Sequence, residues 1–105
     1  MENITVEALH ERLENGEKIH LVDVREPNEH EEFNIGGKLI PLGKIRNMET
    51  EEIDEIKDEE IILYCRSGNR SGQAAAFLET LGFSNVKNLT GGMLAWKEKI
   101  ISDKS

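Results

Sequence analysis

Short apolar runs alternate with segments of helical periodicity along this chain, and this alternation is the feature that most constrains its fold. Runs rich in β-branched and other large apolar residues predict buried strands at 19–24, 61–64 and 86–89. Apolar residues at helical spacing predict helices at 5–15, 48–60, 71–81 and 93–101. This order is typical of an α/β fold with a mainly parallel central sheet and helices on both faces.

The segments between these elements carry weaker signals. Residues 28–45 show no sustained periodicity, so we expect a loop there, with a short strand near Leu39 that Pro41 interrupts. The acidic run from Glu49 to Glu60 is interpreted as the solvated face of a surface helix that turns Ile53 inward. Trp96 lies in phase with the apolar face of the last helix and is expected in the core.

Length and charge limit what the protein can be. A chain of 105 residues predicts a single domain over 1–105, with a frayed tail at 102–105. The net charge of −8 argues against nucleic acid or an anionic membrane as a partner. We find no signal-peptide pattern and no apolar run near the roughly 20 residues that span a bilayer. The single cysteine cannot form an internal disulfide, and a free thiol fits a reducing, cytoplasmic location.

That cysteine, Cys65, stands where a predicted strand gives way to the loop "CRSGNRS" and then to a helix. Ligands of parallel sheets bind beyond the carboxyl ends of the strands, which is where this loop is expected. The seven residues 65–71 hold two arginines and no acid, although the chain as a whole is acidic. The loop is therefore a candidate site for a small anion.

The same loop can activate a thiol. Successive backbone N–H groups in a tight loop can converge on one point, and the following helix adds its positive N-terminal end. Such surroundings lower a cysteine pKa from about 8.5 to roughly 3.5–7.5. Gly68 permits positive φ or close backbone approach, and Arg66 and Arg70 supply charge. The candidate anion-binding residues after Cys65 are Arg66, Ser67, Gly68, Asn69, Arg70 and Ser71. The alternative is that Cys65 is only a small buried apolar residue.

Four segments together resemble the rhodanese family. "CRSGNRS" followed by an alanine-rich helix resembles its active-site loop, and "LVDVREPNEHE" resembles its Asp-Val-Arg segment. "IGGKLIPLGKI" and "NVKNLTGGMLAWK" resemble its Ile-Pro-Leu and closing Gly-Gly…Trp segments. These segments occur in the family order and cover nearly the whole chain. The resemblance implies a single rhodanese-like domain.

The resemblance also implies sulfurtransferase chemistry. The Cys65 thiolate would take sulfane sulfur from a small anionic donor such as thiosulfate and hold it as a persulfide. It would then pass the sulfur to cyanide in vitro, or to a thiol or protein acceptor in cells. Backbone N–H groups from Arg66 to Ser71 would stabilise the persulfide anion, with no cofactor and no metal. Arg66 would attract thiosulfate, whereas Arg70 either binds the anion or braces the loop by pairing with an acid.

Asp23 and Arg25 close the strand 19–24 and are possible supporting residues. We expect mainly structural roles, with Asp23 bonded to nearby backbone and Arg25 paired with an acid such as Glu32. Relatives often carry Gly-His-Ile where this chain has Phe33-Asn34-Ile35, and a small residue in place of Lys38. These departures bear on the choice of acceptor.

Two other functions remain open. A phosphatase or arsenate reductase would also place a cysteine before an anion-binding arginine, but such loops hold five intervening residues. Here four residues separate Cys65 from Arg70, which suits sulfur better than a phosphate group. A non-catalytic rhodanese-like binding or regulatory module is the other alternative. The histidines at 10, 20 and 30 are dispersed on different elements, so we expect no metal site from them.

Overall fold

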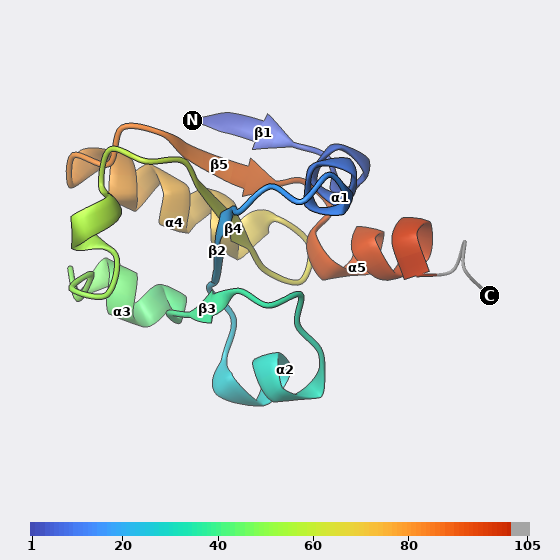
Figure 1. The fold of residues 1–105 in the computed structure, drawn as a ribbon. Coiled ribbons are helices and arrows are strands. Elements are labelled where there is room, and N and C mark those ends of the chain that lie inside the picture. The colour runs from blue at the N-terminus through green and yellow to red at the C-terminus, as the bar shows by residue number, and fades with distance from the viewer. Residues whose placement is uncertain (102–105) are drawn as a thin grey trace.

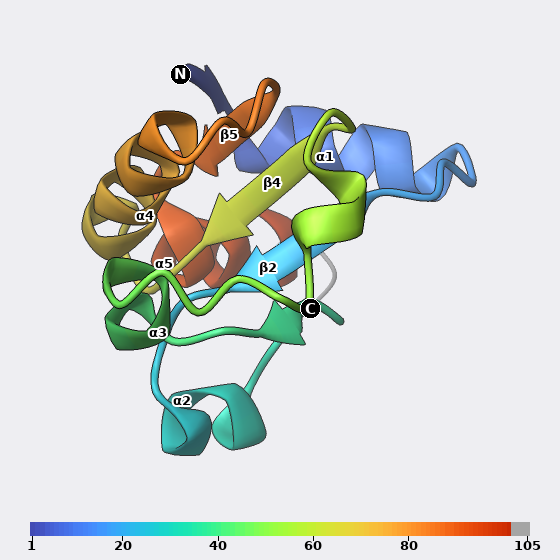
Figure 2. The same ribbon diagram turned by 90° about the vertical axis from the view of Figure 1, so that its left-hand side faces the viewer.

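A five-stranded, entirely parallel sheet forms the centre of the computed structural model, which describes residues 1–101. The predicted fraying of 102–105 lies outside the described residues. The strand order is β1-β5-β4-β2-β3, and β2 and β4 run in the same direction side by side (Figure 2). The strands are β1 (Glu2–Ile4), β2 (His20–Asp23), β3 (Lys38–Leu39), β4 (Ile61–Tyr64) and β5 (Val86–Leu89). The predicted α/β fold is therefore confirmed.

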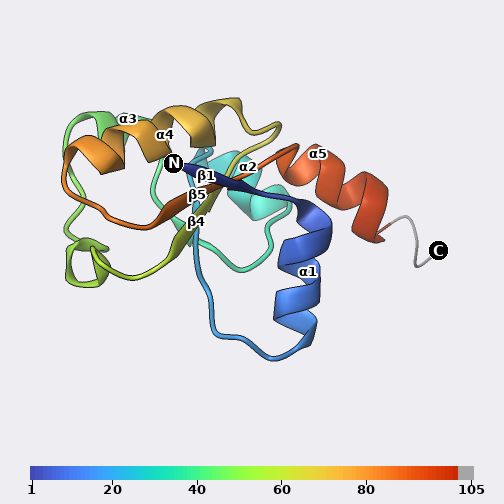
Figure 3. The same ribbon diagram turned by 90° about the horizontal axis from the view of Figure 1, so that it is seen from above.

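Helices cover both faces of this sheet (Figures 1 and 3). On one face lie α3 and α4, and on the other lie α1 and α5. The short α2 stands apart, below β3 in Figure 1. The helices are α1 (Val6–Glu14), α2 (Pro27–Glu32), α3 (Leu42–Arg46), α4 (Asn69–Thr80) and α5 (Gly92–Trp96), which continues into the π-helical turn η2 (Lys97–Ile101). None of these helices is both long and apolar enough to cross a membrane.

The central strand β4 divides the core into two clusters. All four of its residues are buried, and successive side chains point to opposite faces. Ile61 and Leu63 join the cluster beneath α3 and α4, whereas Ile62 and Tyr64 join the cluster beneath α1 and α5. Trp96 packs into this second cluster, as predicted. Because β4 is packed on both faces, the loop that begins after Tyr64 is attached to a firmly held strand.

Two predictions about the connections were wrong. The expected loop at 28–45 contains two short helices, α2 and α3, around the predicted short strand β3. The expected surface helix at 48–60 is instead a series of turns with one 3₁₀ turn, η1 (Asp54–Ile56). Ile53 is 2% exposed and packs into the core with Ile56 beside it, so a short connection anchored at both residues replaces a free helix.

Candidate active site

Cys65 lies directly after β4, at the carboxyl edge of the sheet and before α4, as predicted. The residue is 1% exposed, and its Sγ atom accepts hydrogen bonds from two backbone N–H groups. These come from Gly68 at 3.1 Å and Ser71 at 3.4 Å. The Ser71 hydroxyl also lies 3.4 Å from Sγ. Three polar groups thus converge on one sulfur atom.

Gly68 gives the loop its tight form. Its φ of +102° lies in the left-handed region that side chains other than glycine rarely adopt. A Cβ atom here would also lie 3.4 Å from the backbone nitrogen of Gly91. That distance is an ordinary contact, so the turn at Gly68 depends on glycine for its backbone angle.

These contacts determine the acidity of the thiol. Burial raises the pKa of Cys65, but the hydrogen bonds that Sγ receives, among them those from the backbone N–H groups of Ser71, Gly68 and Ser67, outweigh it. The pKa therefore lies below that of an ordinary thiol, which favours the thiolate. Two of the six predicted N–H donors, those of Gly68 and Ser71, bond the sulfur. A role for the others toward a longer persulfide stays a prediction.

The start of α5 fixes the first residues of the loop. The N–H of Met93 donates to the Cys65 carbonyl at 2.9 Å, and that of Leu94 donates to the Arg66 carbonyl at 3.0 Å. Gly92 allows this approach, since a Cβ atom there would lie 2.7 Å from the Arg66 carbonyl oxygen. The Gly-Gly pair of the closing segment thus fits α5 against the Cys65 loop.

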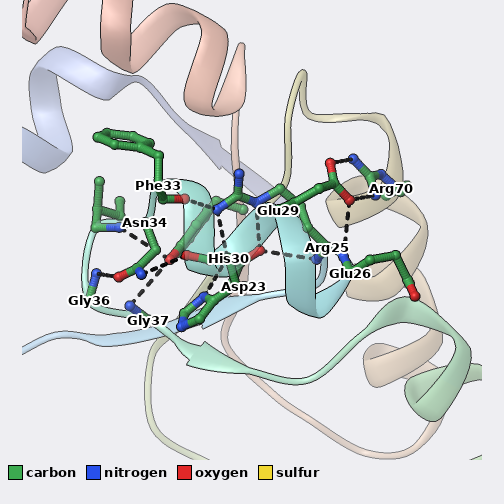
Figure 4. Close-up of polar contacts among 12 residues, drawn as sticks. Asp23, Arg25, Glu26, Glu29, His30, Phe33, Asn34, Gly36, Gly37 and Arg70 are labelled. Atoms are coloured by element: carbon green, nitrogen blue, oxygen red, sulfur yellow. Dashed lines mark hydrogen bonds and ion pairs between the residues drawn. The ribbon is translucent and has the colours of Figure 1, made fainter.

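Arg70 braces the loop in this structure. Its guanidinium donates to both carboxylate oxygens of Glu29, at 2.7 and 2.9 Å, and so joins α4 to α2 (Figure 4). The Arg70 guanidinium lowers the pKa of Glu29 from its ordinary 4.5 to about 2, so this carboxylate stays charged in mild acid. Of the two roles that the sequence left open, the pairing with an acid is the one observed.

Arg25 pairs with an acid, as predicted, but this acid is Asp23 and not Glu32, the one named as an example. Arg25 Nε and Nη2 donate to the two Asp23 oxygens at 2.9 and 2.8 Å, and Nη2 also donates to the Phe33 carbonyl (Figure 4). Asp23 is fully buried and also accepts from the Arg25 backbone N–H at 3.0 Å, the backbone contact that was predicted. A buried carboxylate needs a charged partner nearby, and Asp23 therefore pairs with the arginine two positions along the chain.

His30 completes this cluster, a role that sequence reasoning missed. Its Nδ1 lies 2.8 Å from Asp23 Oδ2. Burial raises the pKa of Asp23, but the hydrogen bonds from Arg25 and His30 lower this pKa by more than burial raises it. The Asp23 carboxylate therefore remains ionised. We call Asp23, Arg25, Glu29 and His30 the α2 network, because they join α2 to the end of β2.

Asn88 of β5 is the second residue that the sequence did not reveal. Its Nδ2 donates to the Gly68 carbonyl at 3.1 Å, and its Oδ1 accepts from the Ser71 hydroxyl. An isolated asparagine in a predicted strand gives no signal of such a role. Only the pairing of β4 with β5 brings it beneath the loop.

A cavity of about 220 Å³ adjoins the loop between α2 and α5. Exposed Arg66, the residue after Cys65, forms part of its wall. The cavity thus offers both charges and an apolar surface beside the residue that follows Cys65. Its other walls include Glu29, Glu32, Phe33, Leu94 and Lys97. Within residues 1–101, no group of three or more His, Cys, Asp or Glu side chains is arranged to hold a metal ion.

Fold and site together define an α/β protein whose parallel sheet presents an acidified thiol inside a loop of backbone donors. The sequence model of the rhodanese-like domain matches residues 5–99, and the chain belongs to this family. It is 42% identical to a sulfurtransferase of Allochromatium vinosum, over 89% of this chain and 85% of that protein. The rhodanese-like domain protein of Staphylococcus aureus superposes with a TM-score of 0.81 at 32% identity, over 91% of each chain.

Longer proteins contain the same unit. The probable adenylyltransferase/sulfurtransferase MoeZ of Mycobacterium tuberculosis is 36% identical over 95% of this chain. The chain spans only 26% of the length of that protein. The match therefore concerns one part of MoeZ.

Proposed function

We propose that the protein is a sulfurtransferase with Cys65 as its nucleophile. The Cys65 thiolate attacks the sulfane sulfur of thiosulfate, and a bond forms between the two sulfur atoms. The sulfur–sulfur bond of thiosulfate breaks, and its electron pair leaves with sulfite. An acceptor thiolate, or cyanide in vitro, then attacks the outer sulfur of the persulfide and releases the Cys65 thiolate. Both steps conserve electrons, so no cofactor is needed.

The arrangement of donors around Sγ is the observation that supports this proposal. The N–H groups of Gly68 and Ser71 point at the sulfur from 3.1 and 3.4 Å and stabilise negative charge there. The same loop offers further N–H groups to an outer sulfur atom. Arg66 is exposed at the cavity wall, where its charge attracts a dianionic donor. A reactive thiol of this kind needs a reducing compartment, which favours the cytoplasm.

The pairing of Arg70 disfavours phosphate chemistry. Both Nη atoms of Arg70 are bonded to Glu29, so the planar fork that would hold phosphate oxygens is already occupied by a carboxylate. Together with the four-residue spacing between Cys65 and Arg70, this favours sulfur as the transferred group.

Intact-mass measurement tests the proposal. After incubation with thiosulfate and removal of the excess, the protein should gain the mass of one sulfur atom and lose it again on addition of cyanide. Cys65→Ser should gain nothing. No gain with thiosulfate, glutathione persulfide or mercaptopyruvate would reject the proposal in favour of a non-catalytic module. Turnover of p-nitrophenyl phosphate comparable to that of thiosulfate would favour a phosphatase instead.

A further inference from the structure

Asn88 contacts the same two loop residues that hold the Cys65 sulfur. Its side chain bonds the Gly68 carbonyl at 3.1 Å and the Ser71 hydroxyl, and the backbone N–H groups of Gly68 and Ser71 both donate to Sγ. Asn88 itself is 8% exposed. One buried amide thus connects both donors of the sulfur to a neighbouring strand.

The chemistry of the partners fixes the orientation of this amide. The Gly68 carbonyl can only accept, so the Asn88 nitrogen faces it and the Asn88 oxygen faces Ser71. The Ser71 hydroxyl must then donate its proton to Asn88. The backbone of Asn88 pairs in register with Leu63 of β4, two residues before Cys65. The residue that bears the amide is therefore anchored to the strand that ends directly before the nucleophile.

We propose that Asn88 is a positioning residue for Cys65: the Asn88 side chain aligns the Gly68 and Ser71 N–H groups with the sulfur. The inference rests on the proposed function of Cys65 as nucleophile. Without Asn88, the loop loses its two side-chain contacts to β5, and the N–H groups are free to turn away from the sulfur. The thiolate loses stabilisation while the thiol, a weak acceptor, loses little. The pKa of Cys65 should therefore rise.

The rate of Cys65 alkylation by iodoacetamide, followed against pH, measures this pKa directly. Asn88→Leu should raise it by roughly half to one unit, which slows alkylation about three- to tenfold at a fixed pH below the transition. The limiting rate at high pH should be unchanged. Asn3→Leu is the matched control, because Asn3 is the exposed register partner of Asn88 on β1 and should leave the profile as it is.

Charged groups on the neighbouring elements are the same in both variants, so they cannot produce the difference. They are Arg66 in the loop, Arg70 of α4, Glu29 of α2, Asp23 of β2 and Lys97 after α5. An unchanged pKa in folded Asn88→Leu would overturn the proposal. A lowered pKa would also overturn it, because it would show that Asn88 only draws the Ser71 proton away from the sulfur.

A measurement on the unaltered protein covers the case in which Asn88→Leu does not fold. The NMR signals of the Asn88 side-chain amide should shift with pH, with an inflection at the Cys65 pKa. Their insensitivity to that ionisation would reject the role. Both experiments report on the thiol alone, so they remain informative even if no donor transfers sulfur to Cys65.

Discussion

Neutral groups hold the sulfur of Cys65, whereas charged groups hold together the α2 network, which contacts the loop through Arg70. The loop uses the N–H groups of Gly68 and Ser71, which keep their hydrogen-bonding character at every ordinary pH. The α2 network uses buried Asp23 and Arg25, with His30 beside them. Neutral donors can stabilise an anion without attracting a fixed counter-ion. The charged pairs instead fix the position of α2, which forms part of the cavity wall.

The loop therefore governs the reactivity of the thiol, and the α2 network supports the fold around it. A change in the loop should alter the reactivity of the thiol, and a change in the α2 network should chiefly alter stability. The Arg70–Glu29 pair joins the two regions, so it should show a small effect of each kind. The variants below test this division.

Asp23→Asn should have the largest effect, and on stability. The substitution leaves Arg25, which is 5% exposed, without its carboxylate. An unpaired buried charge costs about 3–5 kcal/mol. Urea denaturation measures the loss, and exposed Asp58→Asn serves as the control. A loss below 1 kcal/mol (roughly the worth of a surface pair) would contradict a supporting role for the network.

Gly92→Ala should disturb the loop side by a somewhat smaller amount. The new Cβ would press on the carbonyls of Cys65 and Arg66 at a residue with φ of +52°. Strain and displacement together should cost about 2–4 kcal/mol and slow sulfur uptake by the remaining folded protein. Gly43→Ala in α3 is the matched control, because nothing lies within 4 Å of its Cβ position. Equal stability of the two variants would show that α5 does not clamp the loop.

Arg66→Ala should change substrate capture and leave the fold intact. Loss of one exposed cation beside the thiol should lower kcat/KM for thiosulfate by about tenfold, with less effect in high salt. Lys99→Ala removes the same charge on η2, where the side chain is 52% exposed and pairs with Glu7, and should have little effect. Steady-state assays at two ionic strengths distinguish them. Equal losses in the two variants would point to net charge alone.

Glu29→Gln should give the smallest change, and one that depends on pH. The pKa of Glu29 is lowered to about 2 in the folded protein, so its contribution is present above its unfolded pKa of about 4.5 and lost as pH falls toward 2. At neutral pH the substitution should cost about 1 kcal/mol, as expected for a partly exposed pair. Thermal unfolding between pH 7 and pH 3 should show the two proteins converging in acid. A constant difference would contradict the ion pair.

Sequence reasoning succeeded where the signal is local. The strand β4 was predicted because Ile61 to Tyr64 form one continuous apolar run, and the structure buries all four of these residues. Cys65 and the glycine of its loop follow that run directly. For α2 there was no such signal, since none of its residues is buried and it depends on Pro27 and the mutual caps of Glu26 and Glu29.

The missed contacts of the site are those between distant parts of the chain. Asn88 acts on partners 17 and 20 residues earlier, and only the strand order makes them neighbours. Glu32 was named as an example of an acid near Arg25, but Asp23 is more deeply buried and has the greater need of a counter-charge. Which acid an arginine takes depends on burial, which the sequence alone did not supply.

The docking of α5 on the Cys65 loop also has a consequence for synthesis of the protein. Ribosomes build chains from the N-terminus, so Cys65 is made 28 residues before Met93, whose N–H holds the Cys65 carbonyl. At about 5–20 residues per second, this interval lasts about 1–6 s. We therefore expect the nascent thiol to keep ordinary acidity during that time, and to become reactive once the later strand and helix have fixed the loop around it.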